Sequence, residues 1–380
     1  MMRQWLLSKS SINYDAPTID IIRLARSDGV SPRLFFKLIK YFGSAKVALE
    51  RISEFSIKGG RKKPIKIFSE TETEKEIEQL NKINAAIVTY NDPRYSKLLL
   101  KTTYAPPFLI YKGNIKLLNK PGIAIVGSRN ASMGALSFTK KIVKDLIHNP
   151  YVIISGLARG IDTVAHESSF PNTIAVLASG IDHIYPPQNK LLYEKISKEG
   201  LLVAELPFGT VPLAQYFPQR NRIIAGLAIA TVVMEASLKS GSLITAKFAL
   251  EYNREVFAVP GFPLDPRSHG ANKLIKQGAN IVESCEDILN NMPISDNIEN
   301  LSDYDNKYHQ ITFMPNSYQN ITESDRKKIL NLLSSTPIEI ELLLEHTGIS
   351  LPSLYTILLE LELAEKIVRH PGEKISLVYG

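Results

Sequence analysis

Three short turns rich in glycine and serine each follow an apolar, strand-like stretch, and each carries a basic residue. They lie in G-I-A-I-V-G-S-R (122–129), V-I-I-S-G-L-A-R-G-I-D (152–162) and V-V-M-E-A-S-L-K-S-G-S-L-I-T-A (232–246). Small residues let backbone N–H groups approach an anion, and the carboxyl ends of parallel strands meet at one edge of a sheet. We therefore expect a phosphate-binding rim, whose phosphate belongs either to a nucleotide or to a nucleic acid backbone.

The candidate phosphate-binding residues are the small and basic members of these turns. The first two turns contribute Gly127, Ser128, Arg129, Ser155, Gly156, Arg159 and Gly160, and the third contributes Lys239, Ser240, Gly241, Ser242 and Lys247. Lys247 is the weakest of them, because it lies one turn into a helix, where a lysine is usually only solvated. The alternative is that the glycines serve only tight packing of strands against helices.

A further short segment combines aromatic rings, amides and arginines: Q-Y-F-P-Q-R-N-R (215–222). Charge pairing with the backbone and stacking on bases are what single-stranded nucleic acids require of a protein. The alternative is a loop whose aromatic rings pack on the sheet. Beside the three turns, the binding interpretation is favoured.

Several other kinds of site are disfavoured. The first turn does not read G-x-G-x-x-G, no acidic residue follows the second strand to hold a ribose, and no G-x-x-x-x-G-K-[ST] motif occurs. Asp162 and His166 have the spacing of half a metal site but lack further ligands, so a capping role for Asp162 and a local bond for His166 are favoured. No nucleophile–base pair can be assembled from the sequence. We expect no cofactor, no metal and no catalytic residue.

Length and composition limit the number of domains, the kinds of partner and the cellular location that we expect. The chain has 380 residues, enough for two or three domains. The 45 Lys and Arg against 38 Asp and Glu give a net charge of +7, which permits a nucleic acid partner without requiring one. A single cysteine excludes a disulfide framework, and no secretory signal or membrane-spanning run is recognised. We expect a cytoplasmic protein with no membrane partner.

The order of elements predicts an α/β protein with two flanking domains. Strands are expected at 123–126, 152–155, 173–177, 201–205, 230–235 and 255–259, with helices between them at about 134–147, 162–168, 190–199, 220–228 and 243–252. Near-continuous apolar strands that alternate with helices indicate a doubly wound parallel sheet. The expected domains are 1–85, helical; 86–291, Rossmann-like with a lead-in; 292–321, a flexible linker; and 322–380, a winged helix.

The third helix of the predicted winged helix is a poor candidate for reading DNA. That helix, L-P-S-L-Y-T-I-L-L-E-L-E-L (351–363), is apolar and acidic and has no Lys or Arg. A helix in a major groove needs donors for base edges and would be repelled by its own glutamates. We predict that this domain contacts a partner, or binds DNA only weakly through its wing.

Together these motifs resemble the DprA/Smf family of bacterial DNA-processing proteins. Besides the three turns, the matching stretches are V-L-A-S-G-I-D-H-I-Y-P-P-Q-N, A-E-L-P-F-G-T, F-P-Q-R-N-R-I-I-A-G-L and V-F-A-V-P-G-F-P-L-D-P-R-S-H-G-A-N-K-L-I-K-Q-G-A. The resemblance is dense over about 85–285 and only architectural in the tail.

The resemblance implies an extended Rossmann-like domain that binds single-stranded DNA, a helical SAM-like N-terminal domain and a winged-helix tail. Family members dimerise and help to load the RecA recombinase during natural transformation. The phosphate-binding role carries over to the turn residues, and Asn221 and Arg222 match the family's R-N-R motif.

The prediction is therefore a non-enzymatic, homodimeric mediator of recombination that binds single-stranded DNA and assists a RecA-type recombinase. Arg129, Arg159 and Arg222 would contact phosphates, and Tyr185, Tyr216 and Phe217 are candidate stacking residues. The first alternative is a nucleotide-processing hydrolase of the lysine-decarboxylase-like phosphoribohydrolase type. Its P-G-G-x-G-T signature is replaced here by K-S-G-S-L (239–243), which disfavours it. The second alternative is a protein-interaction scaffold without DNA affinity.

Overall fold

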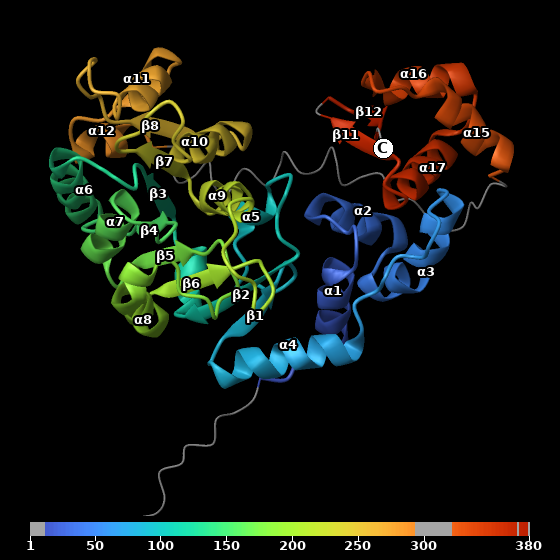
Figure 1. Cartoon of the computed structure of the whole chain (residues 1–380), viewed down its shortest axis with the longest axis horizontal. Coiled ribbons are helices and arrows are strands. Elements are labelled where there is room, and N and C mark those ends of the chain that lie inside the picture. Colours follow the sequence, from blue (N-terminus) through green and yellow to red (C-terminus); the bar gives the residue numbers. More distant parts are fainter. Residues whose placement is uncertain (1–11, 293–320, 371, 379–380) are drawn as a thin grey trace, which may run out of the picture. The chain divides into compact units, whose positions relative to one another are not determined.

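The computed structural model describes residues 12–292, 321–370 and 372–378, which form two compact units (Figure 1). The first unit holds the described residues within Met1–Asn13 and Glu74–Asp303, and the second those within Tyr14–Thr73 and Tyr304–Gly380. The N-terminal helices and the winged helix thus share one unit although they lie at opposite ends of the chain. The predicted linker 292–321 falls outside the described residues except at its two ends.

A nine-stranded sheet forms the centre of the first unit, in the order β1-β2-β6-β5-β4-β3-β7-β8-β9. Strands β3 to β9 run parallel, whereas β1 and β2 add an antiparallel edge beside β6. The strands are β1 (Ala86–Thr89), β2 (Phe108–Gly113), β3 (Gly122–Val126), β4 (Val152–Ser155), β5 (Thr173–Val176), β6 (Leu201–Ala204), β7 (Ala230–Val233), β8 (Glu255–Ala258) and β9 (Asn280–Ile281). The six predicted strands are confirmed.

The order of strands reverses at β3, whose neighbours are β4 on one side and β7 on the other. Such a switch point opens a crevice at the carboxyl ends of the strands. The turns after β3, β4 and β7 are the three turns singled out in the sequence, so the fold brings them to one edge.

Helices cover both faces of this sheet, which explains its near-continuous apolar strands. Ile123 and Ile125 pack toward α6 (Met133–Leu146), α7 (Ile161–Ser169) and α12 (Cys285–Asn290), whereas Ala124 and Val126 pack on the opposite face. That face is covered by α9 (Tyr216–Leu227), α10 (Ser242–Glu251) and α11 (His269–Lys276). Helix α8 (Lys190–Glu199) contacts α7.

The chain between β1 and β2 looks in the sequence like an extended connector broken by prolines, and here the prediction is wrong. It contains the short helix α5 (Lys97–Leu100), which contacts α9, and a fully buried Leu99. The hydroxyl of Tyr95 donates to the carbonyl of Pro106 at 2.6 Å. The loop is therefore packed into the core with η1 (Ile115–Asn119), while α4 (Glu70–Lys82) precedes β1.

The second unit combines α1 (Ala16–Arg26), α2 (Pro32–Phe42) and α3 (Ala45–Lys58) with a winged helix. The latter consists of α15 (Glu323–Leu332), α16 (Ile340–Thr347) and α17 (Leu351–Leu363), with a sheet in the order β10 (Ile338–Glu339), β12 (Lys374–Leu377), β11 (Ile367–His370). Ser31 caps α2, where its side chain accepts from the N–H of Leu34. Helix α15 begins at a Thr322–Asp325 capping box.

The acidic third helix of the winged helix packs against α3 of the N-terminal domain. Gly59, just after α3, lies so close to it that a Cβ there would stand 2.0 Å from the carbonyl oxygen of Glu360. Glu362 pairs with Lys37 at 2.8 Å and with Arg369 at 3.0 Å. Helix α17 is therefore covered in part by α3 of the same chain, and the contact of this domain with a separate partner stays a prediction.

Among the described helices, none alone is long and apolar enough to cross a membrane. Helices α16 and α17 meet that criterion only together, as a pair bent by 119°.

Candidate nucleic-acid interface

The turns 127–130, 156–160 and 237–242, which we call the rim, follow β3, β4 and β7 at the carboxyl edge of the sheet. The N–H of Ser128 donates to the carbonyl of Glu235 at 2.8 Å, and the N–H of Ile161 donates to the carbonyl of Ser128 at 3.3 Å. The first turn is therefore held between the other two strand ends.

Gly160 allows the first two turns to touch. Its φ is +77°, and a Cβ there would stand 2.4 Å from the carbonyl oxygen of Ser128. Gly127 is enclosed in the same way, because a Cβ would lie 2.6 Å from Ile161. Both glycines therefore serve close packing within the chain, which is the alternative that the sequence leaves open, and a phosphate contact at either of them stays a prediction.

The backbone N–H groups of the second turn donate to side chains of the helix that follows it. The Asp162 carboxylate accepts from the N–H of Gly156 at 3.1 Å and of Ala158 at 3.3 Å. His166 Nε2 accepts from the N–H of Leu157 at 3.2 Å, and its Nδ1 lies 2.7 Å from Thr173 Oγ1. Asp162 thus holds the turn from within α7 rather than capping the helix, and the amides of 156–158 have protein acceptors.

Burial fixes the protonation of His166. It lowers the pKa of this fully buried imidazole to about 3, with a smaller effect from the positive Arg220, so the ring is neutral. Burial also raises the pKa of Asp162, and Arg220 opposes that rise. His166 is a hydrogen-bonded core histidine. Within the described part of the chain, no group of three or more His, Cys, Asp or Glu side chains is placed to hold a metal ion.

Ser155 differs from its predicted role. Its side chain is fully buried, and its hydroxyl donates to the carbonyl of Ile125 at 2.6 Å. It is the last residue of β4, where the side chain turns toward the neighbouring strand and away from the edge. The predicted phosphate contact of this hydroxyl is therefore disfavoured by the geometry.

An exposed arginine and two aromatic rings from three different segments meet at the rim. The guanidinium of Arg129 lies 4.8 Å from the ring centroid of Phe217, and Tyr185 meets Phe217 edge-on at 5.6 Å between centroids. Arg129 is exposed, and Tyr185 is 41% exposed. The sequence predicts each of the three separately, and the fold brings them together. Tyr216, half-buried, is the first residue of α9.

Arg220 lies beneath this cluster and is absent from the predicted site residues. It is 6% exposed, and its Nη1 donates to the carbonyl of Val176 at 2.7 Å. A Cβ on Gly156 would strike its guanidinium, and its Nε has no hydrogen-bond partner in the described structure. Burial lowers its pKa to about 10, so it stays protonated at neutral pH. The signal that could have found it is its place in Arg220-Asn221-Arg222.

The other two residues of that triplet have structural partners. The guanidinium of Arg222 is buried, pairs with the Glu205 carboxylate and donates to the carbonyl of Tyr104. This engagement disfavours the predicted phosphate contact. The Asn221 side chain donates to the carbonyl of Gly241 at 3.0 Å, which ties α9 to the third turn.

The third turn presents hydroxyls and a cation. Ser240 Oγ, half-buried, and Ser242 Oγ, buried, lie 2.7 Å apart where α10 begins, and Lys239 and Gly241 are exposed beside them. Helix N-termini favour anions. Arg159 is also exposed, in the second turn. Lys247 points along α10 to Glu251 at 3.6 Å, as expected of a surface lysine.

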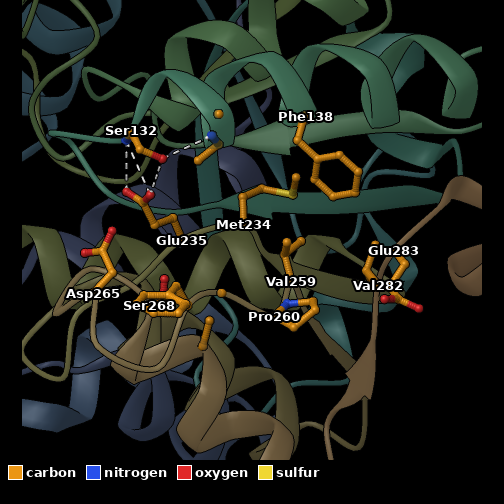
Figure 2. Close-up of a pocket in the computed structure, with 15 residues that line it drawn as sticks. Ser132, Phe138, Met234, Glu235, Val259, Pro260, Asp265, Ser268, Val282 and Glu283 are labelled. Atoms are coloured by element: carbon orange, nitrogen blue, oxygen red, sulfur yellow. Dashed lines mark hydrogen bonds between the residues drawn. The ribbon is translucent and has the colours of Figure 1, made fainter.

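The partial positive charge at the N-terminus of α6 is already compensated by a carboxylate of the same chain. The Glu235 carboxylate, 6% exposed, accepts from the hydroxyl of the cap residue Ser132 at 2.6 Å and from its N–H at 3.1 Å (Figure 2). A dinucleotide pyrophosphate would require this helix end. The arrangement agrees with the absence of a dinucleotide motif.

A doubly wound sheet with this rim, joined to a small helical domain and a winged helix, defines a multidomain Rossmann-like protein. Family models match along the chain: "DNA recombination-mediator protein A" over 86–293, "DprA-like N-terminal HHH domain" over 15–78 and "DprA winged helix domain" over 315–373. The chain belongs to the DprA/Smf family.

Relatives and solved structures agree with this assignment. Protein Smf of Synechocystis sp. is 36% identical over 322 residues, 78% of this chain and 81% of the relative. DNA processing protein DprA of Streptococcus pneumoniae is 47% identical over 188 residues, 49% of this chain and 66% of the relative.

Among solved structures, DprA from Streptococcus pneumoniae aligns with TM-score 0.61 and 33% identity over 74% of this chain and 100% of its own. DprA from Helicobacter pylori, studied for its single-stranded DNA binding mode, aligns with TM-score 0.50 and 30% identity over 54% and 94%. The predicted fold and family are confirmed.

Proposed function

We propose that this chain binds single-stranded DNA at the rim, through the phosphate backbone. The observation that carries the proposal is the exposed Arg129 guanidinium 4.8 Å from the ring of Phe217, with Tyr185 beside it. A cation held on an aromatic platform offers a phosphate partner and a stacking surface at one place, which single strands exploit and duplexes, with their bases stacked inside, do not.

In this proposal the cations Arg129, Arg159 and Lys239 face the backbone, and the hydroxyls of Ser128, Ser240 and Ser242 supply hydrogen bonds. Gly241, which is exposed, leaves room for the DNA backbone, whereas Gly127, Gly156 and Gly160 hold the turns in place. Arg220 supports the second turn from below, and Asn221 fixes the third. We give Ser155 and Arg222 structural roles because their polar atoms already have buried partners.

A non-enzymatic role is part of the proposal. Asp162 and His166, which follow the second turn, are buried in hydrogen bonds with it, and the Glu235 carboxylate, which precedes the third turn, accepts from Ser132. The relatives named as DNA processing proteins support DNA as the ligand. From family membership we further propose a cytoplasmic homodimer that assists a RecA-type recombinase. Light scattering and a strand-exchange assay with that recombinase test these two points.

Fluorescence anisotropy with a labelled oligo-dT and its duplex counterpart, over a salt series, tests the central proposal. Wild type is compared with Arg129→Ala and with Lys144→Ala, an exposed lysine in the last turn of α6. We expect single-strand binding that falls steeply with salt. Arg129→Ala should weaken it roughly tenfold and lower the salt slope by about 0.7, the value for one phosphate contact.

The control variant Lys144→Ala should match wild type. If Arg129→Ala binds oligo-dT as wild type does, the rim is not the site. If oligo-dT is not bound at all while nucleoside monophosphates are turned over, the hydrolase alternative replaces the proposal.

A further inference from the structure

The segment 59–66, which follows α3 and which we call the basic loop, has no part in the rim. It reads G-G-R-K-K-P-I-K. The N-terminal part of the second unit, 14–73, contains this loop and has 12 Lys and Arg against 7 Asp and Glu. An excess of positive charge of this kind is the electrostatic mark of a surface that meets a polyanion.

Hydrogen bonds hold the basic loop at both of its ends. The N–H of Arg61 donates to the carbonyl of Ser56 at 3.0 Å, and the carbonyl of Lys66 accepts from the N–H of Asp28 at 3.1 Å. Between these points the side chain of Ile65 is buried. The exposed residues of the loop are therefore carried on a fixed backbone, which reduces the entropy that a bound ligand would cost them.

A lysine of the winged helix lies against this loop. Gly60 has a φ of +91°, and a Cβ added there would strike the ammonium group of Lys366. The backbone of Lys366 is fixed as well, because its N–H donates to the carbonyl of Leu361 at 3.0 Å and its carbonyl accepts from the N–H of Val378 at 2.8 Å. Segments from before and after the Rossmann-like domain thus place cations on one surface.

The cations of this surface outnumber the acidic groups beside them. Lys62 and Lys63 are exposed, and no ion pair among the described residues includes Lys62, Lys63 or Lys366. Arg61 pairs at 3.4 Å with Glu365, whose side chain is 62% exposed. Because like charges repel one another, an anion bound among these groups would relieve the repulsion.

The residue types of this surface suit a phosphate backbone rather than exposed bases. The stretch Lys62-Lys63-Pro64 is exposed and offers ammonium groups, but it contains no aromatic ring on which a base could stack. A double helix keeps its bases stacked inside and presents about one phosphate charge per 1.7 Å of its axis. Ammonium groups on flexible side chains can pair with such a dense row of phosphates without reading the sequence.

We propose that the basic loop and Lys366 form a second DNA contact, which binds the phosphate backbone of duplex DNA. The inference goes beyond the rim, because this surface lies in the second unit and binds duplexes, whereas the rim in the first unit binds single strands. The choice of DNA over an anionic membrane surface rests on the proposed function, since both present phosphates.

Fluorescence anisotropy with a labelled short duplex, over a series of low salt concentrations, tests the inference. The double variant Lys62→Ala/Lys63→Ala should bind the duplex roughly tenfold more weakly than wild type, with a salt slope lower by about 1.8, the value for two phosphate contacts. Lys366→Gln should lower the slope by about 0.9. The matched control is Lys140→Ala/Lys141→Ala, which removes the same charge from two adjacent exposed lysines of α6 and should bind as wild type does.

Glu365→Gln should have an effect of the opposite sign, which damage to the fold does not mimic. It removes the carboxylate that pairs with Arg61, so affinity for the duplex should rise roughly threefold. Its control is Glu167→Gln, which makes the same change of charge at an exposed residue of α7 and should leave the affinity unchanged.

A wild type that binds no duplex, or a Lys62→Ala/Lys63→Ala variant that binds it equally well, would overturn the inference. Binding of oligo-dT that depends on Arg129 would still support the rim in either case. Weaker binding of the double variant to phosphatidylglycerol vesicles, with duplex binding unchanged, would assign the surface to a membrane and also overturn the inference. Duplex binding that depends on the loop, without any binding of oligo-dT, would instead overturn the proposed function.

Discussion

Replacement of Gly160 by alanine is expected to separate the first two turns of the rim. The native φ of +77° is unfavourable for a residue with a side chain, at a cost of about 1–3 kcal/mol. The new Cβ would also stand 2.4 Å from the Ser128 carbonyl oxygen and 2.8 Å from that of Arg129, and overpacking of this kind costs about 1–3 kcal/mol. Together we expect at least about 2 kcal/mol of destabilisation around the rim.

The chain has two units, so a single unfolding curve would mix two transitions. Hydrogen exchange measured by mass spectrometry resolves the peptides of each unit. In Gly160→Ala, amides of β3 and β4 should exchange roughly thirtyfold faster, whereas peptides of the second unit should be unchanged. Affinity for oligo-dT should fall as well, because Arg129 loses the support of the turn beneath it.

Gly134→Ala is the matched control, since it adds the same methyl group where no atom lies within 4 Å. It should leave exchange unchanged or slightly slowed, because alanine is the better helix former. If Gly160→Ala exchanges like wild type, the contact between the two turns does not hold the rim together, and a glycine is not needed at this position.

Three further predictions concern buried groups. Gly59→Ala should destabilise the second unit by about 1–3 kcal/mol in exchange experiments, because its methyl would stand 2.0 Å from the Glu360 carbonyl oxygen; unchanged protection of α3 would contradict this. Glu362→Gln should cost about 3 kcal/mol in the same assay, since it leaves the cation of Lys37 without its charge partner; a loss below 1 kcal/mol would show that the pair is not effectively buried. His166 has its pKa lowered to about 3, so below pH 6.5 the unfolded state binds a proton that the native state does not. Stability of the first unit should therefore fall by about 1 kcal/mol per pH unit between pH 6 and 4, and a His166→Gln variant, less stable at pH 7, should lack this slope.

The alternation of strands and helices could be predicted from the sequence, because strands buried on both faces of a sheet are almost continuously apolar. The six inner parallel strands and their helices are of this kind. Helix α5 and strand β9 have only four and two residues, and the sequence does not predict them. Strands β1 and β2 pair antiparallel and stand outside the alternation of strands and helices from which the other strands are predicted, and the loop between them depends on tertiary contacts such as that of Tyr95 with Pro106.

The sequence predicts where the candidate site lies, but it predicts the roles of the individual side chains less well. Residue type and spacing placed Arg129, Phe217 and Tyr185 as candidates, but only the fold shows that they meet. Conversely, the sequence does not show whether the side chain of a serine at a strand end, or of an arginine in a helix near the rim, points outward or inward. Ser155 and Arg222 point inward to protein partners, and the R-N-R triplet marks Arg220 without showing that its side chain is a buried support of the second turn.

The pairing of Lys37 with Glu362, which are 325 residues apart, has a consequence for synthesis of the protein. Helices α1 to α3 leave the ribosome before the Rossmann-like domain, whereas α17, which covers α3, follows that domain. At typical rates of about 5–20 residues per second, the apolar face of α3 waits roughly 15–65 seconds for α17. The nascent chain thus carries an uncovered surface throughout synthesis of the Rossmann-like domain, and a transcript cut short before α17 would leave it uncovered for good.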